Sequence, residues 1–131
     1  MKDVLLQNDS DYLYLACPYT DKDPLVEEQR YLAVVRAAGH LMLQGFNVFS
    51  PIAHSHPIAL HGMTQPTTGL FWKKQDIPLL KHASALVVLM LPGWEQSKGL
   101  AWEIETARAL HMPLLWLNSD FSVYDIEKLA A

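Results

Sequence analysis

Short apolar runs alternate along this chain with longer segments of helical periodicity. The runs predict strands at 12–16, 46–50, 85–90 and 114–117, and the third, ALVVLM, is continuously apolar like a parallel strand covered on both faces. Alternating strands and helices are typical of doubly wound α/β proteins. We therefore expect one domain over residues 1–131, with a flavodoxin- or Rossmann-like parallel sheet of four to five strands and helices on both faces.

Capping residues mark the first predicted helix. Asp23 is a good N-cap, Pro24 suits the first helical position, and Gly45 is expected to close the helix. The apolar residues at helical spacing within it are Leu32, Val35, Ala38 and Met42.

The middle of the chain has a different character. Residues 51–69 are rich in Pro, His, Gly and Thr without a clear period, so we expect a functional loop or lid there. A helix disturbed at Pro78 is predicted over 71–83, another helix begins at Gly99, and the tail 123–130 is weakly helical.

Composition limits the classes of function. The net charge of −4 disfavours binding to a nucleic-acid polymer, which needs a clustered basic face, but it permits a small anionic ligand held by backbone N–H groups. The single cysteine fits a reducing compartment. With no signal-peptide core and no apolar run long enough to span a bilayer, we expect a soluble cytoplasmic protein that makes no membrane contact.

A carboxylate, Glu103, lies within the apolar stripe of the helix over 99–111. The other members of the stripe are Leu100, Ile104, Ala107, Leu110 and His111. Glu105 points the opposite way and lies near Arg108, as a solvated acid would. Because desolvating an ionised carboxylate is costly, Glu103 is a candidate functional group.

Ligands of open α/β sheets bind beyond the carboxyl ends of the strands, which selects three segments of this chain. These segments are CPYTD with Pro18 and Tyr19, SPIAHSH with His54, and LPGWEQSKG with Ser97, Lys98 and Gly99. We expect these six residues to bind the substrate.

The start of the helix over 99–111 suits an anion. Ser97 is the expected N-cap, and the exposed N–H groups that follow favour a phosphate. Glu103 lies about 9 Å further along the helix axis. A ligand with a phosphate at one end and a sugar C1 at the other would span this distance. The Glu103 carboxylate could then attack C1 to form a glycosyl-enzyme, while a second group assists the departing base or activates water.

Three stretches resemble the nucleoside 2-deoxyribosyltransferase superfamily, which includes 2'-deoxynucleoside 5'-phosphate N-hydrolases. They are YLYLACPYTD, KKQDIPLLKHASALVVLM and SKGLAWEIETARALHMPLLWL, and the resemblance covers residues 12–118. The segment SPIAHSHPIALHG follows neither enzyme group closely and is more similar to an uncharacterised, DUF1937-type branch.

The resemblance implies roles for individual residues. Glu103 matches the family nucleophile, Tyr14 would orient it, and Asp76 would hold a sugar hydroxyl or help protonate the departing base. Ser97 stands where the hydrolases contact phosphate and the transferases tend to have an Asp, which favours a nucleoside 5'-monophosphate as ligand. The resemblance also implies no cofactor, no metal, and a homo-oligomer such as a dimer or tetramer.

Each of these residues also has a structural reading. Glu103 could pair with a nearby Lys or Arg, and Asp76 could be a helix cap or turn acid. Tyr14 could be an ordinary strand aromatic, and strand alternation places Tyr12 on the same face, so the pattern alone does not separate the two tyrosines. Ser97 could only cap its helix, and Lys98 could be solvated.

Cysteine and histidine allow two other readings. Cys17 could be a nucleophile but is more typical of a small buried hydrophobe. His54, His56 and His61 could form a metal site, although their spacing matches no standard zinc motif; His54 is the better candidate for the sugar or base pocket.

Four functions remain open from the sequence. They are an N-glycosidase acting on a nucleoside monophosphate, a deoxyribosyltransferase, a nucleotide-binding module without catalysis, and a metal-dependent hydrolase built on the loop histidines. Trp72 and Trp94 flank the expected site and could stack on a base or pack in the core.

Overall fold

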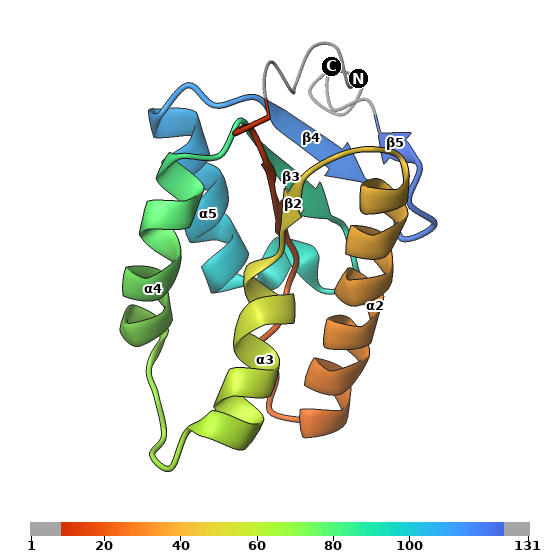
Figure 1. Cartoon of the computed structure of the whole chain (residues 1–131). Coiled ribbons are helices and arrows are strands. Elements are labelled where there is room, and N and C mark those ends of the chain that lie inside the picture. The colour runs from red at the N-terminus through yellow and green to blue at the C-terminus, as the bar shows by residue number, and fades with distance from the viewer. Residues whose placement is uncertain (1–8, 125–131) are drawn as a thin grey trace.

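A computed structural model describes residues 9–124 as an α/β domain with a mainly parallel sheet (Figure 1). The strands are β1 (Leu13–Ala16), β2 (Val48–Phe49), β3 (Ala85–Leu89), β4 (Leu114–Leu117) and β5 (Val123–Tyr124). The helices are α2 (Pro24–Leu43), α3 (Pro51–Gly62), α4 (Gly69–Lys81), the 3₁₀ turn η1 (Trp94–Gln96) and α5 (Lys98–Ala109). None of the helices in the described range is long and apolar enough to cross a membrane.

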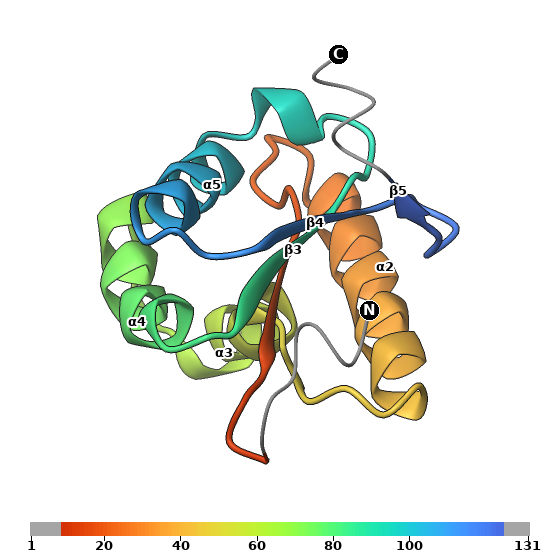
Figure 2. The same cartoon turned by 90° about the horizontal axis from the view of Figure 1, so that it is seen from above.

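The strand order is β2-β1-β3-β4-β5, in which the first four strands are parallel and β5 is antiparallel. Figure 2 shows α2 on one side of this sheet and α4 and α5 on the other. Alternate side chains of β1 accordingly enter two cores, Leu13 and Leu15 packing on the α2 side and Tyr14 and Ala16 on the α5 side. The predicted fold class is confirmed.

The two predicted helix starts are also confirmed. The Asp23 carboxylate accepts a hydrogen bond from the backbone N–H of Leu25 at 2.9 Å, with Pro24 in the first turn. The Ser97 hydroxyl oxygen accepts one from the N–H of Leu100 at 3.2 Å. The two capped helices follow β1 and, after the turn η1, β3 in the chain.

The prediction of a functional loop or lid over 51–69 is wrong for most of that segment, because residues 51–62 form the helix α3. The Ser50 side chain caps it by accepting from the N–H of Ala53 at 3.1 Å, and Pro51 occupies the first turn, where its missing N–H is harmless. Pro57 lies inside the helix. The composition of this segment therefore concealed a helix whose cap and first residue were present in the sequence.

Helix α2 presents a different face to the sheet from the one its apolar spacing singled out. Leu32, Val35 and Met42 are 40%, 39% and 51% exposed. The residues that α2 buries are Val34, Ala37, Ala38 and Leu41. Only Ala38 belongs to both sets, so α2 carries a second apolar face that the described fold does not cover.

The helix predicted over 71–83 is present as α4, Gly69–Lys81, with Pro78 inside it. One smaller expectation differs from the structure. Val123 and Tyr124, at the start of the expected weakly helical tail, form β5. The remainder of that tail lies outside the described residues.

Candidate functional site

Three predicted catalytic residues come together from three elements. Tyr14 projects from β1, Asp76 from α4 and Glu103 from the second turn of α5, and the charges of both acids act on Tyr14. Glu103 is only 8% exposed. Among residues 9–124 the structure contains one ion pair, between Glu28 and His56. Glu103 therefore has no lysine or arginine partner in this range. The structural reading of Glu103 as one half of an internal ion pair is excluded for this part of the chain.

Hydrogen bonding separates the two tyrosines that share a face of β1. Tyr12 donates its hydroxyl to the carbonyl of Leu79, a structural contact. The Tyr14 hydroxyl is fully buried, and within residues 9–124 no partner meets normal hydrogen-bond geometry. It nevertheless lies near enough to Glu103 to affect the ionisation of that acid. A buried hydroxyl without a regular partner is unusual and marks Tyr14 as the candidate functional tyrosine.

Burial shifts the ionisation of all three groups. Desolvation raises the pKa of Glu103 to about 8; the Tyr14 hydroxyl partly opposes this shift, and the charge of Asp76 adds to it. Burial raises the pKa of Asp76 to about 6. The pKa of Tyr14 is raised by burial first, and then by Glu103 and Asp76. At neutral pH the ligand-free site therefore holds Glu103 mainly as the neutral acid, which explains how it is buried without a cation.

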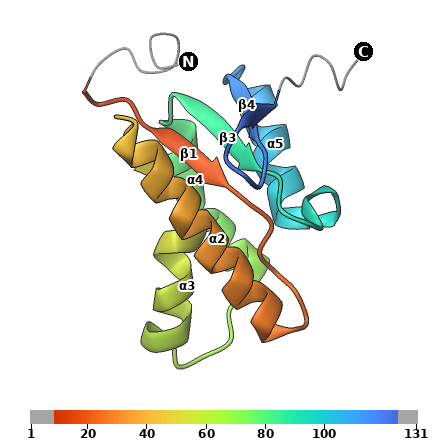
Figure 3. The same cartoon turned by 90° about the vertical axis from the view of Figure 1, so that its right-hand side faces the viewer.

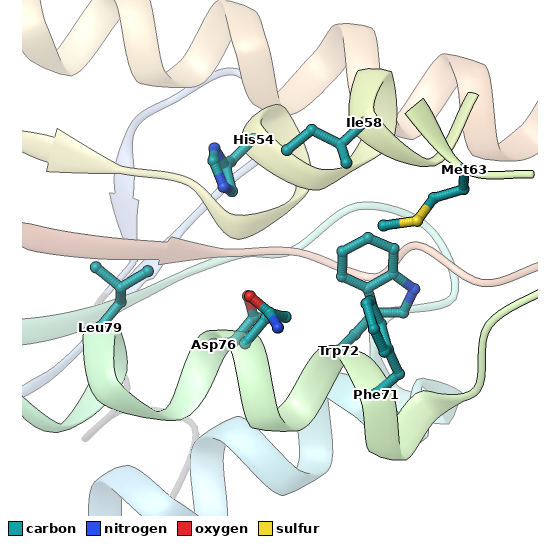
Figure 4. A pocket seen from close by; sticks show the side chains of 8 residues that line it. His54, Ile58, Met63, Phe71, Trp72, Asp76 and Leu79 are labelled. Atoms are coloured by element: carbon teal, nitrogen blue, oxygen red, sulfur yellow. The ribbon is translucent and has the colours of Figure 1, made fainter. Parts of the chain in front are cut away.

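Beside Asp76, α3 and α4 enclose a pocket of about 240 Å³ (Figure 4). Its polar lining consists of His54, Gln75 and Asp76. Its apolar lining consists of Ile58, Met63, Phe71, Trp72 and Leu79. An apolar and aromatic hollow with a few polar groups is the usual make-up of a small-molecule site.

The aromatic wall of this pocket is held by local contacts. The rings of Phe71 and Trp72 meet edge to face with centroids 4.9 Å apart, and the Trp72 indole N–H donates to the Thr67 hydroxyl oxygen at 2.9 Å. A second hollow of about 350 Å³, formed by the turn between α3 and α4, shares Met63 and Phe71 with the first. The hollow beside Asp76 therefore extends toward residues 62–68.

The predicted binding residues are distributed unevenly around this pocket. His54 and Asp76 line it, and Asp76 also acts electrostatically on Glu103, so Asp76 connects the hollow to the buried acid. Ser97 caps α5, and its neighbours Lys98 and Gly99 are exposed. None of these three residues lines the pocket beside Asp76.

The loops that follow β1 and β3 are joined by Arg30. Its Nη1 donates to the carbonyls of Tyr19 and Thr20, each at 3.2 Å, and its Nη2 donates to the carbonyl of Pro92 at 3.1 Å. Gly93 has φ +88°, and a Cβ there would lie 2.7 Å from Nη2 of Arg30. The predicted binding segment at Pro18 and Tyr19 is thus fixed to the segment that precedes α5.

Sequence reasoning missed a chain of three polar side chains between α2, α3 and the loop after β1. The Tyr19 hydroxyl lies 2.7 Å from Nδ1 of His56, and Nε2 of His56 lies 2.8 Å from Oε2 of Glu28. Tyr31 stacks on the imidazole with centroids 4.1 Å apart. Because a carboxylate only accepts, Nε2–H donates to Glu28, and in the neutral imidazole Nδ1 then accepts from the Tyr19 hydroxyl. No signal in the sequence pairs residues this far apart.

Helical geometry separates the histidines that an extended loop would have grouped. His54 lines the pocket while His56 is buried toward α2, since residues two apart on a helix face opposite ways. Among the described residues no three His, Cys, Asp or Glu side chains are grouped closely enough to hold a metal ion. The loop-histidine metal hydrolase loses its structural basis in this part of the chain.

Replacing His56 with alanine is expected to lower the free energy of unfolding by about 2 kcal/mol, because two hydrogen bonds and a stacked ring are lost from a buried position. His56→Gln should cost less, since its amide can still reach Glu28. Urea denaturation measures both variants. Exposed His61→Ala is the control and should leave stability unchanged. A His56→Ala variant as stable as this control would contradict a structural role for the chain of contacts.

Cys17 is placed as an inert thiol. It is 4% exposed, and burial followed by the charge of Glu103 raises its pKa, while Arg30 has a smaller opposite effect. A buried cysteine with a raised pKa holds little thiolate at neutral pH, which argues against a nucleophilic role.

Comparisons with known proteins agree with this fold. A solved structure of the 2-deoxyribosyltransferase from the psychrotolerant bacterium Bacillus psychrosaccharolyticus superposes with a TM-score of 0.56 at 19% sequence identity, covering 88% of this chain and 78% of that one. At this identity the likeness concerns the fold alone. A search for relatives among curated proteins found no match. Residues 11–118 match the model of the family described as domain of unknown function DUF1937, and the chain belongs to that family.

Proposed function

We propose that this protein is an N-glycosidase-type enzyme that cleaves the base–sugar bond of a (deoxy)nucleoside 5'-monophosphate through a covalent glycosyl-enzyme on Glu103. The observation that carries the proposal is the buried Glu103 near Tyr14 and Asp76, which has no cation partner among residues 9–124, with Asp76 at the wall of a hollow. The fold shared with a 2-deoxyribosyltransferase supports the same class of chemistry.

In the first step the ionised Glu103 carboxylate forms a bond to C1' of the sugar while the bond from C1' to the base breaks. The electron pair of that bond leaves with the base, and protonated Asp76 supplies the proton that the base nitrogen needs. The Tyr14 hydroxyl, whose proximity already opposes the rise in the pKa of Glu103, donates a hydrogen bond to the carboxylate once Glu103 is ionised. In the second step water attacks C1', Asp76 accepts a proton from that water, and Glu103 is released.

The two acids share their protons in a way that suits this sequence of steps. With pKa values of about 8 for Glu103 and about 6 for Asp76, the pair carries roughly one proton between these two pH values. In the ligand-free site that proton lies mainly on Glu103. The positive charge that develops at C1' favours the anion on Glu103, and therefore the transfer of the proton to Asp76.

The base and the phosphate have separate subsites in this proposal. The base occupies the hollow of about 240 Å³, where Trp72 and Phe71 offer aromatic surface and His54 and Gln75 offer polar groups. The phosphate lies at the start of α5, where backbone N–H groups and the helix dipole favour an anion. Ser97 at this helix start carries no charge that would repel a phosphate.

The test is incubation of the protein with each deoxynucleoside 5'-monophosphate, followed by chromatography for free base. Release of base, with the monophosphate preferred over the corresponding nucleoside, is the expected result. Failure to release base from any monophosphate would contradict the proposed activity.

The alternative of base exchange has a specific observation in its favour, since the similar solved structure is a 2-deoxyribosyltransferase. Adding a second free base to the same incubation separates the two reactions, because only a transferase forms the exchanged nucleoside. Ligand binding measured by calorimetry without any product would instead identify a nucleotide-binding module.

A further inference from the structure

The second apolar face of α2 lies on the side of the helix away from the sheet. At about 100° per residue, the buried positions Val34 and Leu41 point almost directly away from Leu25, Leu32 and Leu43. These three leucines are 62%, 40% and 93% exposed. Figure 3 views the molecule from this side and shows α2 in front of β1 with no other described element over its outer face.

The exposed stripe contains more than leucines. We define the α2 outer stripe as Leu25, Glu28, Leu32, Arg36, Gly39 and Leu43, which fall within about a quarter of the helix circumference. A Cβ placed on Gly39 would meet no atom of the described residues within 4 Å, so the backbone there is open to close approach. Val35 and Met42, 39% and 51% exposed, extend the apolar surface along one edge.

We propose that the α2 outer stripe is the surface on which a second copy of this chain docks, with the two α2 helices antiparallel and the twofold axis at Leu32. A twofold interface must be complementary to itself, so that residue i meets residue j and j meets i. The part of the stripe from Leu25 to Gly39 meets this condition, because its charges and its bulky and small residues are arranged symmetrically about Leu32, whereas Leu43 lies beyond the symmetric part.

The charges show the symmetry most clearly. Glu28 lies four residues before Leu32 and Arg36 four residues after it, so antiparallel pairing about Leu32 places each glutamate opposite the partner's arginine. The Glu28 side chain is 44% exposed although one of its oxygens meets His56. Arg36 is exposed and forms no ion pair with any other residue of 9–124. Parallel pairing would instead bring like charges together.

Side-chain size follows the same symmetry. Leu25 lies seven residues before Leu32 and Gly39 seven residues after it, so the same pairing puts each leucine over the open backbone of a partner glycine. The apolar side chains Leu25 and Leu32 then leave water in both copies. None of the six stripe residues lines the pocket between α3 and α4, so this proposal does not depend on the proposed activity.

The first test is the oligomeric state of the full chain by sedimentation velocity at increasing concentration. We expect a reversible dimer, a reduction of its affinity by at least about 100-fold in Leu32→Glu, and weaker association in Arg36→Glu. Circular dichroism and urea denaturation check that both variants stay folded, which is expected because both side chains are exposed. A native chain that is monomeric at about 100 µM overturns the proposal. The occupant of the α2 outer stripe would then be residues 1–8 or a different protein.

The second test fixes the register. The one native cysteine, Cys17, is buried, so Leu32→Cys creates a single accessible thiol at the twofold axis. Mild oxidation should convert it rapidly to a disulfide-linked dimer. The matched control is Leu70→Cys on α4, at a side chain that is 77% exposed, and it should cross-link only at the slow rate of random collision. Equal cross-linking of the two variants, or faster cross-linking through residue 70, overturns the assignment of the surface even if a dimer exists.

Discussion

Replacement of Glu103 by alanine is expected to lower kcat for base release by about 10³-fold or more, because the variant has no group to form the glycosyl-enzyme. Binding of the monophosphate should change far less, since the aromatic hollow and the start of α5 are untouched. The measurement is base release with saturating substrate, together with the dissociation constant from calorimetry.

Glu105→Ala is the matched control for this result. Glu105 lies on the same helix but is exposed, so its removal should leave kcat unchanged. Turnover in Glu103→Ala equal to that of the control would remove the mechanism.

The pH dependence of kcat/KM in the Asp76→Asn variant shows whether Glu103 acts as the nucleophile or as the acid of the reaction. Without Asp76, the change of kcat/KM with pH reports the ionisation of Glu103. The pKa of Glu103, about 8, includes a contribution from the charge of Asp76 and should fall somewhat when that charge is removed. A nucleophile must be ionised, so kcat/KM should rise with pH through this range. A limb that falls with pH would instead make Glu103 the acid of the reaction.

Replacement of Glu103 by glutamine is expected to stabilise the fold at alkaline pH. The pKa of Glu103 in the folded protein, about 8, lies above its ordinary value of 4.5, so the unfolded chain gives up this proton at lower pH than the folded one. Stability of the native protein is therefore lost as pH rises from about 4.5 to about 8, on the order of 5 kcal/mol in total. Glutamine is neutral throughout and avoids this loss.

Urea denaturation across this pH range measures the effect. The free energy of unfolding of Glu103→Gln minus that of the native protein should increase with pH up to about 8 and then stay constant. The free energy of unfolding of Glu105→Gln, a change at an exposed site, should vary with pH in the same way as that of the native protein. A Glu103→Gln difference that does not change with pH would show that the buried acid is not held protonated. A fold that becomes more stable when a site residue is removed is a common property of functional sites.

Local chemistry determined much of this protein before any tertiary contact was known. The caps at Asp23 and Ser97 depend on one side chain and the two or three residues after it, so the sequence predicts them directly. The position of Glu103 in an apolar stripe depends only on helical period. The apolar run of β3 likewise predicts a strand covered on both sides. These features established the α/β order and the candidate acid.

The helix α3 shows where composition misled. Its proline- and histidine-rich residues suggested a loop, yet the cap at Ser50 and the proline at residue 51 are ordinary helix-start chemistry. Pro57 inside the helix removes one backbone donor, a cost that packing against α2 and the contacts of His56 help to offset. Composition therefore gave the wrong answer although the local signals for a helix start were present.

By itself the sequence determined the first four strands, the helices α2, α4 and α5, and the caps at Asp23 and Ser97, but not α3 or β5. The tertiary structure alone decided which face of α2 meets the sheet, because a helix that is apolar on two sides has no local preference between them. It also decided that Asp76 lies beside Glu103 and that Tyr19, His56 and Glu28 join. Those contacts link residues far apart in the chain, and only the packing of helices on a twisted sheet sets the distances between them.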